Sequence, residues 1–314
     1  MLTMGVAAVA AFTPAYGQEQ AIRTQTFTYK TVGNLEIKAD VHRADDDTVR
    51  PVVVWIHGGA LIMGNRSGLN RVTTMMLSAG YAVVSIDYRL APETRLPAII
   101  EDLEDAFTWV RTEGPALFDI EPSRIAVIGA SAGGYLTLTS GFRAQPRPTV
   151  LVSFFGYGDL VGDWYSQPSH HARHNRVRIT EDEAQLQMGG PPVSDSRDRV
   201  GDGGLLYNYS RQQGTWPEVV SGWDPHTEAE KFYPFMPVQN TTQDYPPTML
   251  IHGTSDTDVP YEQSVMMAEQ FNRHGVPHEL VTIPGAEHGL ADGDPQLIDR
   301  AYDDALAWIN LYMQ

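Results

Sequence analysis

The stretch that decides the fold is Gly129–Gly134, which reads G-A-S-A-G-G. It follows an apolar run, Ile125–Ile128, and precedes a helical run, Tyr135–Phe142. A G-x-S-x-G pentapeptide at such a strand-to-helix junction is the context of a nucleophile elbow, in which glycines let strand and helix approach a strained serine. The helix N-terminus beneath that serine favours negative charge. The stretch therefore predicts Ser131 as a nucleophile at the edge of a sheet.

Apolar runs on both sides of this stretch predict the rest of the sheet. These runs alternate with segments whose apolar residues have helical spacing, such as Leu96–Arg111. We therefore expect a mainly parallel, eight-stranded α/β sheet with helices on both faces. The first two strands form an antiparallel pair that turns at Gly33-Asn34. The expected strands are Thr26–Lys30, Leu35–Val41, Val52–Ile56, Ala82–Asp87, Ile125–Gly129, Thr149–Phe155, Thr248–His252 and Glu279–Ile283, with further helices at Tyr261–His274 and Pro295–Met313.

Residues 157–242 break this alternation. They are rich in Gly, Pro, Asp, Arg and aromatic residues, and only Thr180–Met188 is clearly helical, with Thr180 and Glu183 as a capping box. A long irregular stretch between two core strands is usually functional. We interpret it as a cap inserted into one α/β domain that spans residues 18–314.

The composition narrows the possible partners and the location. The chain of 314 residues has 22 Lys and Arg against 39 Asp and Glu, a net charge of −17, which repels nucleic acid and anionic lipid, so we expect neither as a partner. The absence of cysteine excludes disulfides, thiolate nucleophiles and cysteine-ligated zinc. Residues 1–17 resemble a signal peptide, with the short apolar run Val6–Phe12 before the small residues Ala15 and Gly17, and predict a periplasmic or secreted protein.

A serine hydroxyl needs a base and an orienting acid to act as a nucleophile. In the elbow architecture the chain order is serine, acid, histidine. Asp256 follows the expected strand Thr248–His252, and His288 follows Glu279–Ile283. Because parallel strands end at the same edge, both side chains should lie beside Ser131. The sequence predicts the triad Ser131, Asp256 and His288.

Other titratable residues near these positions offer alternatives. Asp258 could serve as the acid, but Asp256 lies nearer the strand end, and Asp258 has the setting of a helix entry residue. We expect Glu287 to be solvated. His252 and His57 are expected to pack or to hold their own loops rather than to move protons.

The chain also offers candidate donors for an oxyanion. Val52–Ile56 is followed by His57-Gly58-Gly59-Ala60, and consecutive glycines let backbone N–H groups turn towards a ligand. In the elbow architecture one donor is the residue after the nucleophile, here Ala132, and the others come from such a glycine loop.

The insertion concentrates aromatic side chains and histidines. Its aromatic residues either line a substrate pocket, for which Trp164, Tyr165, Trp216 and Trp223 are the candidates, or form the core of the cap itself. His170, His171 and His174 lack an evident carboxylate partner, so we expect a solvated polar loop and no metal site. No cofactor is expected, because serine-based hydrolysis needs only water.

These residues resemble the α/β-hydrolase superfamily, and within it the hormone-sensitive-lipase-like carboxylesterases and the acetyl-xylan and feruloyl esterases. The resemblance covers about residues 35–155 and 245–312. It implies the α/β-hydrolase fold, with Ser131 as nucleophile, His288 as general base and acid, and Asp256 as orienter. It also implies Gly58, Gly59 and Ala132 as oxyanion donors. The segments that carry it are His57–Gly59, Ser85–Glu93, the elbow, His252–Pro260 and Gly285–Gly289.

The resemblance also bears on the reaction. Ala60 stands where the lipase-like pattern usually has a third glycine, which argues against esters of bulky tertiary alcohols. An insertion after the sixth strand favours the xylan and feruloyl esterase branch or the peptidase-like branch. We therefore predict a serine hydrolase of short-acyl carboxylic esters, such as acetyl or feruloyl esters, on small molecules or polysaccharide. His252–Pro260 also resembles the prolyl-oligopeptidase catalytic domain, so an exopeptidase or amidase is one alternative, and a non-catalytic ligand-binding homologue is another.

Overall fold

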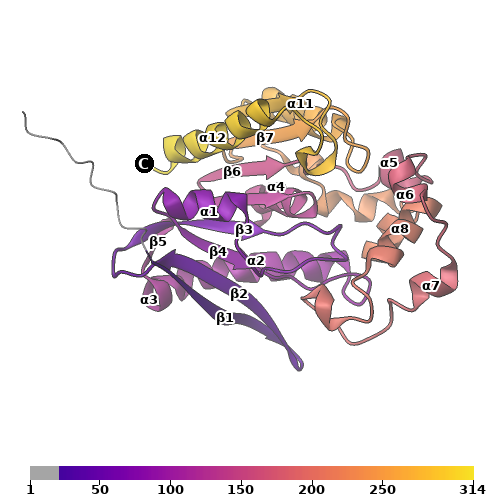
Figure 1. Ribbon diagram of the computed structural model, residues 1–314, viewed down its shortest axis with the longest axis horizontal. Coiled ribbons are helices and arrows are strands. Elements are labelled where there is room, and N and C mark those ends of the chain that lie inside the picture. Colours follow the sequence, from indigo (N-terminus) through magenta and orange to yellow (C-terminus); the bar gives the residue numbers. More distant parts are fainter. Residues whose placement is uncertain (1–20) are drawn as a thin grey trace, which may run out of the picture.

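A computed structural model describes residues 21–314, and the expected signal peptide, residues 1–17, lies outside them. These residues form one eight-stranded sheet in the order β1-β2-β4-β3-β5-β6-β7-β8 (Figure 1). The β1–β2 and β2–β4 pairs are antiparallel, and the other five pairs are parallel. The predicted mainly parallel α/β sheet is confirmed. Its strands are β1 (Ile22–Val32), β2 (Leu35–Ala44), β3 (Arg50–Ile56), β4 (Ala82–Ile86), β5 (Ile120–Ala130), β6 (Val150–Phe154), β7 (Thr248–Gly253) and β8 (His278–Ile283).

The antiparallel edge extends further than the apolar pattern predicts. β1 and β2 pair from Ile22 opposite Ala44 to Val32 opposite Leu35, and the chain reverses at Gly33, whose φ is +59°. Most of β1 is exposed or half-buried because it is the edge strand. Backbone pairing continues there without an apolar face, so hydrophobicity alone underestimates the length of β1.

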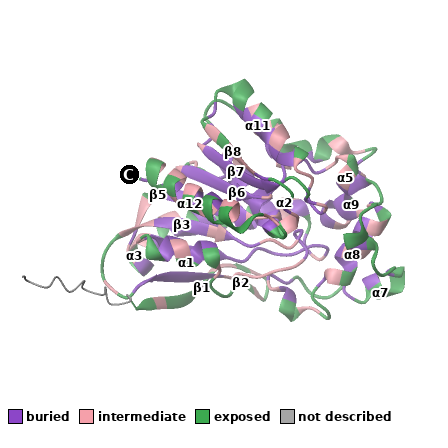
Figure 2. Ribbon diagram, turned by 45° about the horizontal axis from the view of Figure 1, so that its top comes forward, coloured by how far each residue is buried: buried purple, intermediate pink, exposed green. Residues whose placement is uncertain are grey.

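Helices cover both faces of the sheet. Successive residues of a strand point to opposite faces and pack into two separate hydrophobic cores, one on each face. On one face, α1 (Arg71–Ser78) and α12 (Pro295–Tyr312) pack with residues such as Val53. On the other face, neighbouring residues such as Val52 join a core with three more helices. The central strands are buried on both sides, whereas the outer surfaces of α11 and α12 are exposed (Figure 2). The helices of the second face are α2 (Leu96–Thr112), α4 (Ala132–Arg143) and α11 (Glu262–His274), and α3 (Gly114–Phe118) follows α2.

The insertion between β6 and β7 lies beyond the C-terminal ends of the parallel strands, at the right of Figure 1. It is more helical than the sequence analysis predicts. The expected helix Thr180–Met188 is shorter, and a longer helix, α8, lies between two left-handed glycines, Gly203 and Gly214. The α8 helix was missed because its buried face includes Ser210 and Arg211, which interrupt the apolar spacing. The helices of the insertion are α5 (Asp163–Ser166), α6 (Ala172–Asn175), α7 (Glu181–Gln185), α8 (Gly204–Gln213), α9 (Trp216–Ser221) and α10 (Pro237–Asn240), with short 3₁₀ turns at Ser196–Asp198, Ala229–Lys231 and Tyr233–Phe235.

Within residues 21–314, no helix combines the length and the apolar character needed to cross a membrane.

Candidate active site

Ser131 occupies a strained turn between β5 and α4. Its backbone has φ +56° and ψ −121°, a conformation that a side-chain-bearing residue rarely adopts. The turn is possible because its flanking glycines allow close contact. A Cβ on Gly129 would lie 2.2 Å from the carbonyl oxygen of Gly133, and one on Gly133 would lie 2.1 Å from that of Ile56. The Ser131 N–H donates to the carbonyl of Phe154 at 2.9 Å, which ties the turn to β6.

The structure brings Ser131, His288 and Asp256 together from the ends of three strands. His288 Nε2 lies 3.1 Å from Ser131 Oγ, and His288 Nδ1 lies 2.7 Å from Asp256 Oδ2. Asp256 follows β7, and His288 follows β8 at the start of a 3₁₀ turn, His288–Leu290. The rings of Phe155 and His288 pack in a T-shaped arrangement with centroids 4.9 Å apart. The distance from Ser131 Oγ to His288 Nε2 allows transfer of the serine proton to the imidazole. The distance from His288 Nδ1 to Asp256 Oδ2 allows the carboxylate to orient the imidazole.

Asp256 is held as a carboxylate in a buried position. Burial alone would raise its pKa, but hydrogen bonds and positive charge from His252 and His288 lower the pKa to about 2. Its Oδ1 accepts from the backbone N–H groups of Asp258 and Val259, each at 2.9 Å. These bonds leave Oδ2 to face His288, as an orienting acid requires. His252 itself packs inside the β7–α11 connection, with Nδ1 2.7 Å from Ser264 Oγ.

The glycine loop after β3 lies against the elbow. A Cβ on Gly58 would be 2.8 Å from the carbonyl oxygen of Ala130 and 3.2 Å from the Cβ of Ser131, so Gly58 is in direct contact with the turn. Gly59 follows with φ +112°, and Ala132 is the first residue of α4. The backbone of all three predicted oxyanion donors therefore belongs to the two segments that meet around Ser131.

His57 fixes the start of this loop. Its ring stacks on that of Tyr88 with centroids 4.4 Å apart, and its Nδ1 lies 2.8 Å from the Gly58 carbonyl oxygen. Tyr88 OH donates to the His57 carbonyl at 3.0 Å. Burial lowers the pKa of His57 to about 4, so the imidazole is neutral at ordinary pH. This is the loop-holding position that the sequence analysis expects for His57.

The four aromatic pocket candidates separate into two groups. Tyr165 and Trp216 are each only 1 % exposed and stack with centroids 3.8 Å apart, so for them the cap-core interpretation is right. Trp216 Nε1 also donates to the carbonyl of Ala60 at 3.0 Å, which anchors the glycine loop to the cap. Trp223 packs its ring against Phe232, while Trp164 lines a cavity.

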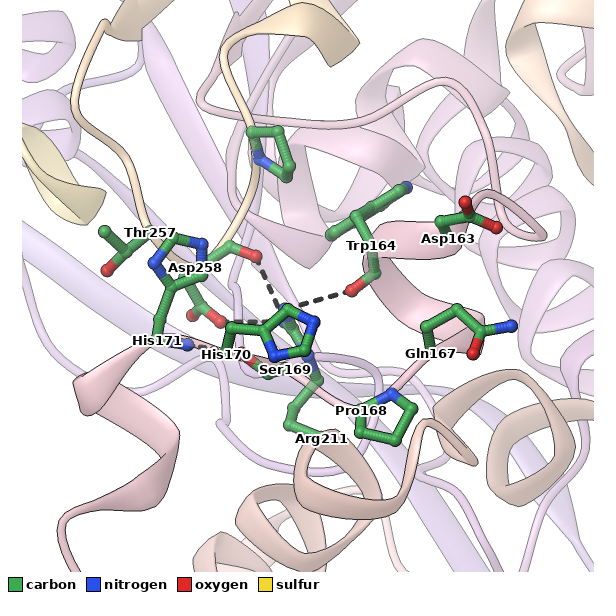
Figure 3. A pocket seen from close by; sticks show the side chains of 11 residues that line it. Asp163, Trp164, Gln167, Pro168, Ser169, His170, His171, Arg211, Thr257 and Asp258 are labelled. Atoms are coloured by element: carbon green, nitrogen blue, oxygen red, sulfur yellow. Dashed lines mark hydrogen bonds and ion pairs between the residues drawn. The ribbon is translucent and has the colours of Figure 1, made fainter.

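Two adjacent cavities open beside the triad. The first, of about 580 Å³, is lined by Trp164, Arg211 and Asp258 among others (Figure 3). The second, of about 610 Å³, includes His288. Thr257 lines both cavities, so they adjoin.

Three polar residues near the site differ from their predicted environments. His174 is buried, not solvated, with Nδ1 2.8 Å from Ser169 Oγ and Nε2 2.9 Å from Asp258 Oδ1. Asp258 is not a helix entry residue, because α11 begins only at Glu262. Glu287 is not free in solvent, since it accepts hydrogen bonds from the backbone and the hydroxyl of Thr257.

These contacts join segments far apart in the chain, His174 and Asp258 being 84 positions apart, so local sequence gives no signal for them. Across the part of the chain that the structure describes, no cluster of three or more His, Asp and Glu side chains is arranged to hold a metal ion.

Comparisons with known proteins agree with this architecture. The BD-FAE family profile matches residues 40–178, which contain Ser131 and the glycine loop. The prolyl oligopeptidase family profile matches residues 203–314, which contain Asp256 and His288. Among curated proteins, the non-reducing polyketide synthase pkbA of Emericella nidulans is 26 % identical over 89 % of this chain but only 14 % of its own length. The chain thus spans about one-seventh of that relative.

Solved structures define the class of the fold. An alpha/beta hydrolase superfamily protein from Enterococcus faecalis has a TM-score of 0.69 at 24 % identity, covering 91 % of this chain and 98 % of its own. A truncated carbohydrate esterase from gut microbiota has a TM-score of 0.66 at 20 % identity, covering 95 % and 99 %. The sheet order and these likenesses show that the chain has the α/β-hydrolase fold, as the resemblance in its sequence implies.

Proposed function

We propose that this α/β-hydrolase cleaves carboxylic esters through an acyl-enzyme on Ser131. The proposal is carried by the continuous contact from Ser131 Oγ to His288 Nε2 at 3.1 Å and from His288 Nδ1 to Asp256 at 2.7 Å, beside the glycine loop. The fold alone supports many chemistries, and it is the geometry of these three side chains that favours ester hydrolysis.

In the proposed reaction, Ser131 Oγ attacks the ester carbonyl while His288 Nε2 accepts the hydroxyl proton. Asp256 holds Nδ1–H and stabilises the imidazolium. The N–H groups of Ala132, Gly58 and Gly59 are the proposed donors to the tetrahedral oxyanion. The C–O bond to the alcohol then breaks, and His288 returns the proton to the departing oxygen. Water, deprotonated by His288, cleaves the acyl-enzyme and regenerates the serine.

We propose short-acyl esters, such as acetyl or feruloyl esters on small molecules or polysaccharide, as substrates. The buried rings of Tyr165 and Trp216 fill the cap behind the Ala60 loop, which favours a small acyl group. The net charge of −17 favours neutral substrates. A series of p-nitrophenyl esters from acetate to decanoate tests this: kcat/KM should be highest for the shortest chains, and a maximum at decanoate would refute it.

The role of Ser131 has a direct test. The Ser131→Ala variant should fold normally but lose hydrolysis of p-nitrophenyl acetate, and a fluorophosphonate probe should add its mass to the peptide containing Ser131 in the wild type only. Wild-type turnover by the variant would refute the assignment. Absence of both labelling and turnover in the wild type would instead favour a non-catalytic ligand-binding homologue.

An exopeptidase or amidase is a second candidate. It is favoured by the match of residues 203–314 to the prolyl oligopeptidase family. The same triad can cleave amides, whose leaving group must be protonated before it departs. Comparing kcat/KM on p-nitrophenyl acetate with that on aminoacyl p-nitroanilides separates the two, and a preference for the anilides would favour the peptidase.

We also propose that the protein is exported to the periplasm or the medium, on the basis of residues 1–17. Expression of the full chain followed by N-terminal sequencing of the recovered protein should show a start near Gln18. A start at Met1 in the cytoplasmic fraction would contradict export.

A further inference from the structure

A second carboxylate faces His288 at the nitrogen that Asp256 does not contact. Asp256 binds Nδ1, whereas Asp258 Oδ2 lies 3.7 Å from Nε2. Nε2 is also the atom that faces Ser131 Oγ at 3.1 Å. Asp258 is thus placed next to the atom that gains the proton in the proposed reaction.

The cap holds the other oxygen of Asp258. Oδ1 accepts from His174 Nε2 at 2.9 Å, from Arg211 Nη1 at 3.0 Å and from the hydroxyl of Tyr207. Arg211 also donates to the backbone carbonyl of Asp258 at 3.0 Å and, through Nη2, to the carbonyl of Trp164 at 3.1 Å. Figure 3 shows Arg211 between these two partners. Because three donors bind Oδ1, the carboxylate cannot rotate freely, and Oδ2 keeps its orientation towards His288.

Asp258 carries its charge in this position. Burial by itself would raise its pKa, but the hydrogen bond from His174 and the positive charges of His288 and Arg211 hold the pKa well below its ordinary value. Arg173 lies 3.8 Å from Asp258 Oδ2 and forms an ion pair with Glu287. The charged surroundings of Asp258 therefore also include the Arg173 cation and the Glu287 anion.

We propose that Asp258 is a positioning residue that couples the cap to the triad, which rests on the proposed ester hydrolysis. The cap donors clamp Oδ1, so Oδ2 stays beside Nε2 of His288. There it stabilises the imidazolium that forms when His288 takes the proton of Ser131. The cap is then part of the proton-transfer machinery as well as a cover for substrate.

The substitution Asp258→Asn removes the negative charge of the side chain and keeps its size and shape. For Asp258→Asn we expect kcat on p-nitrophenyl acetate to fall about tenfold with KM changed less than about threefold, because the lost interaction is made only after proton transfer. The acid limb of the kcat/KM profile should move to lower pH, because a positive imidazole is less favourable without the neighbouring carboxylate. A purely structural role would not move this limb.

Two further variants keep the test decisive. Asp258→Asn leaves the buried Arg211 without its counter-ion, which can disturb folding, so Asp258→Asn is also combined with Arg211→Gln to remove both charges. If Asp258 only holds the cap, the acid limb stays at its wild-type position in both the single and the double variant, which overturns the proposal. If Asp258 positions the charge, the acid limb moves to lower pH in both variants. The matched control is Asp303→Asn, an exposed carboxylate on α12 that lines neither cavity, and it should leave the profile unchanged.

The outcomes separate this inference from the proposed function. A wild-type protein that neither hydrolyses p-nitrophenyl acetate nor reacts with a fluorophosphonate refutes ester hydrolysis itself. An active wild type with unchanged kcat and pH profile in Asp258→Asn overturns only the role of Asp258.

Discussion

Replacing Trp216 with phenylalanine tests whether the cap holds the glycine loop in place. The indole stacks on Tyr165, and its Nε1 donates to the Ala60 carbonyl at 3.0 Å. Ala60 is itself in the left-handed region, with φ +56°, and is only 6 % exposed. Phenylalanine keeps a ring for stacking but leaves this buried carbonyl without that donor, which costs about 1–3 kcal/mol.

The same loop carries two of the proposed oxyanion donors, so loosening it should affect catalysis as well as stability. Loss of one such donor costs about 3 kcal/mol in serine hydrolases, and a partial loss from loop displacement should lower kcat roughly tenfold. For Trp216→Phe we therefore expect a fall of about 1–3 kcal/mol in the free energy of unfolding and about tenfold in kcat.

The assays are urea denaturation followed by fluorescence and the hydrolysis of p-nitrophenyl acetate. The control is Trp223→Phe, the same chemical change at a cap residue that packs on Phe232 and Phe235 instead. The control should lose stability without a comparable loss of kcat. If Trp216→Phe loses stability while its kcat stays at the wild-type value, the loop does not depend on this anchor and the reasoning is wrong.

Three other predictions follow from the geometry of the site. Asp256→Asn should lower kcat by about 10³-fold or more because the imidazole loses its orienting acid, as measured with p-nitrophenyl acetate. Because the pKa of Asp256 is lowered to about 2 in the folded protein, its stabilisation of about 2 kcal/mol is complete above pH ~4 and is lost as the pH falls towards 2. Urea denaturation across this range should show the loss, and Asp256→Asn should reduce it. Gly133→Ala places a Cβ 2.1 Å from the Ile56 carbonyl oxygen and should destabilise the fold by about 3 kcal/mol or more, and a thermal midpoint within a degree or two of the wild type would contradict this.

The features that could be predicted from the sequence are those that depend on residues close together in the chain. Short apolar runs such as Val52–Ile56 fix the strands, and the glycines around Ser131 fix the turn, because each depends on residues close in the chain. The edge of a parallel sheet then places Asp256 and His288 near Ser131 without further information.

The cap resists such prediction for physical reasons. The α8 helix buries Arg211, a residue that local patterns assign to the surface, because its charge is matched by Asp258 at 3.0 Å. Such burial is favourable only when the partner is already in place, and the partner lies on another segment of the chain. The predicted solvation of His174 is wrong for the same reason. The sequence leaves open whether Tyr165 and Trp216 line a pocket or form the cap core, because their burial depends on how the cap packs against the glycine loop.

The separation of Ser131 from His288 by 157 positions has a consequence for biosynthesis. A ribosome finishes the serine turn long before it reaches the strand, β8, that leads into the imidazole. Until that last strand docks at the edge of the sheet, the hydroxyl is an ordinary alcohol. Partly synthesised or prematurely terminated chains should therefore be inert towards esters in the cell that makes them.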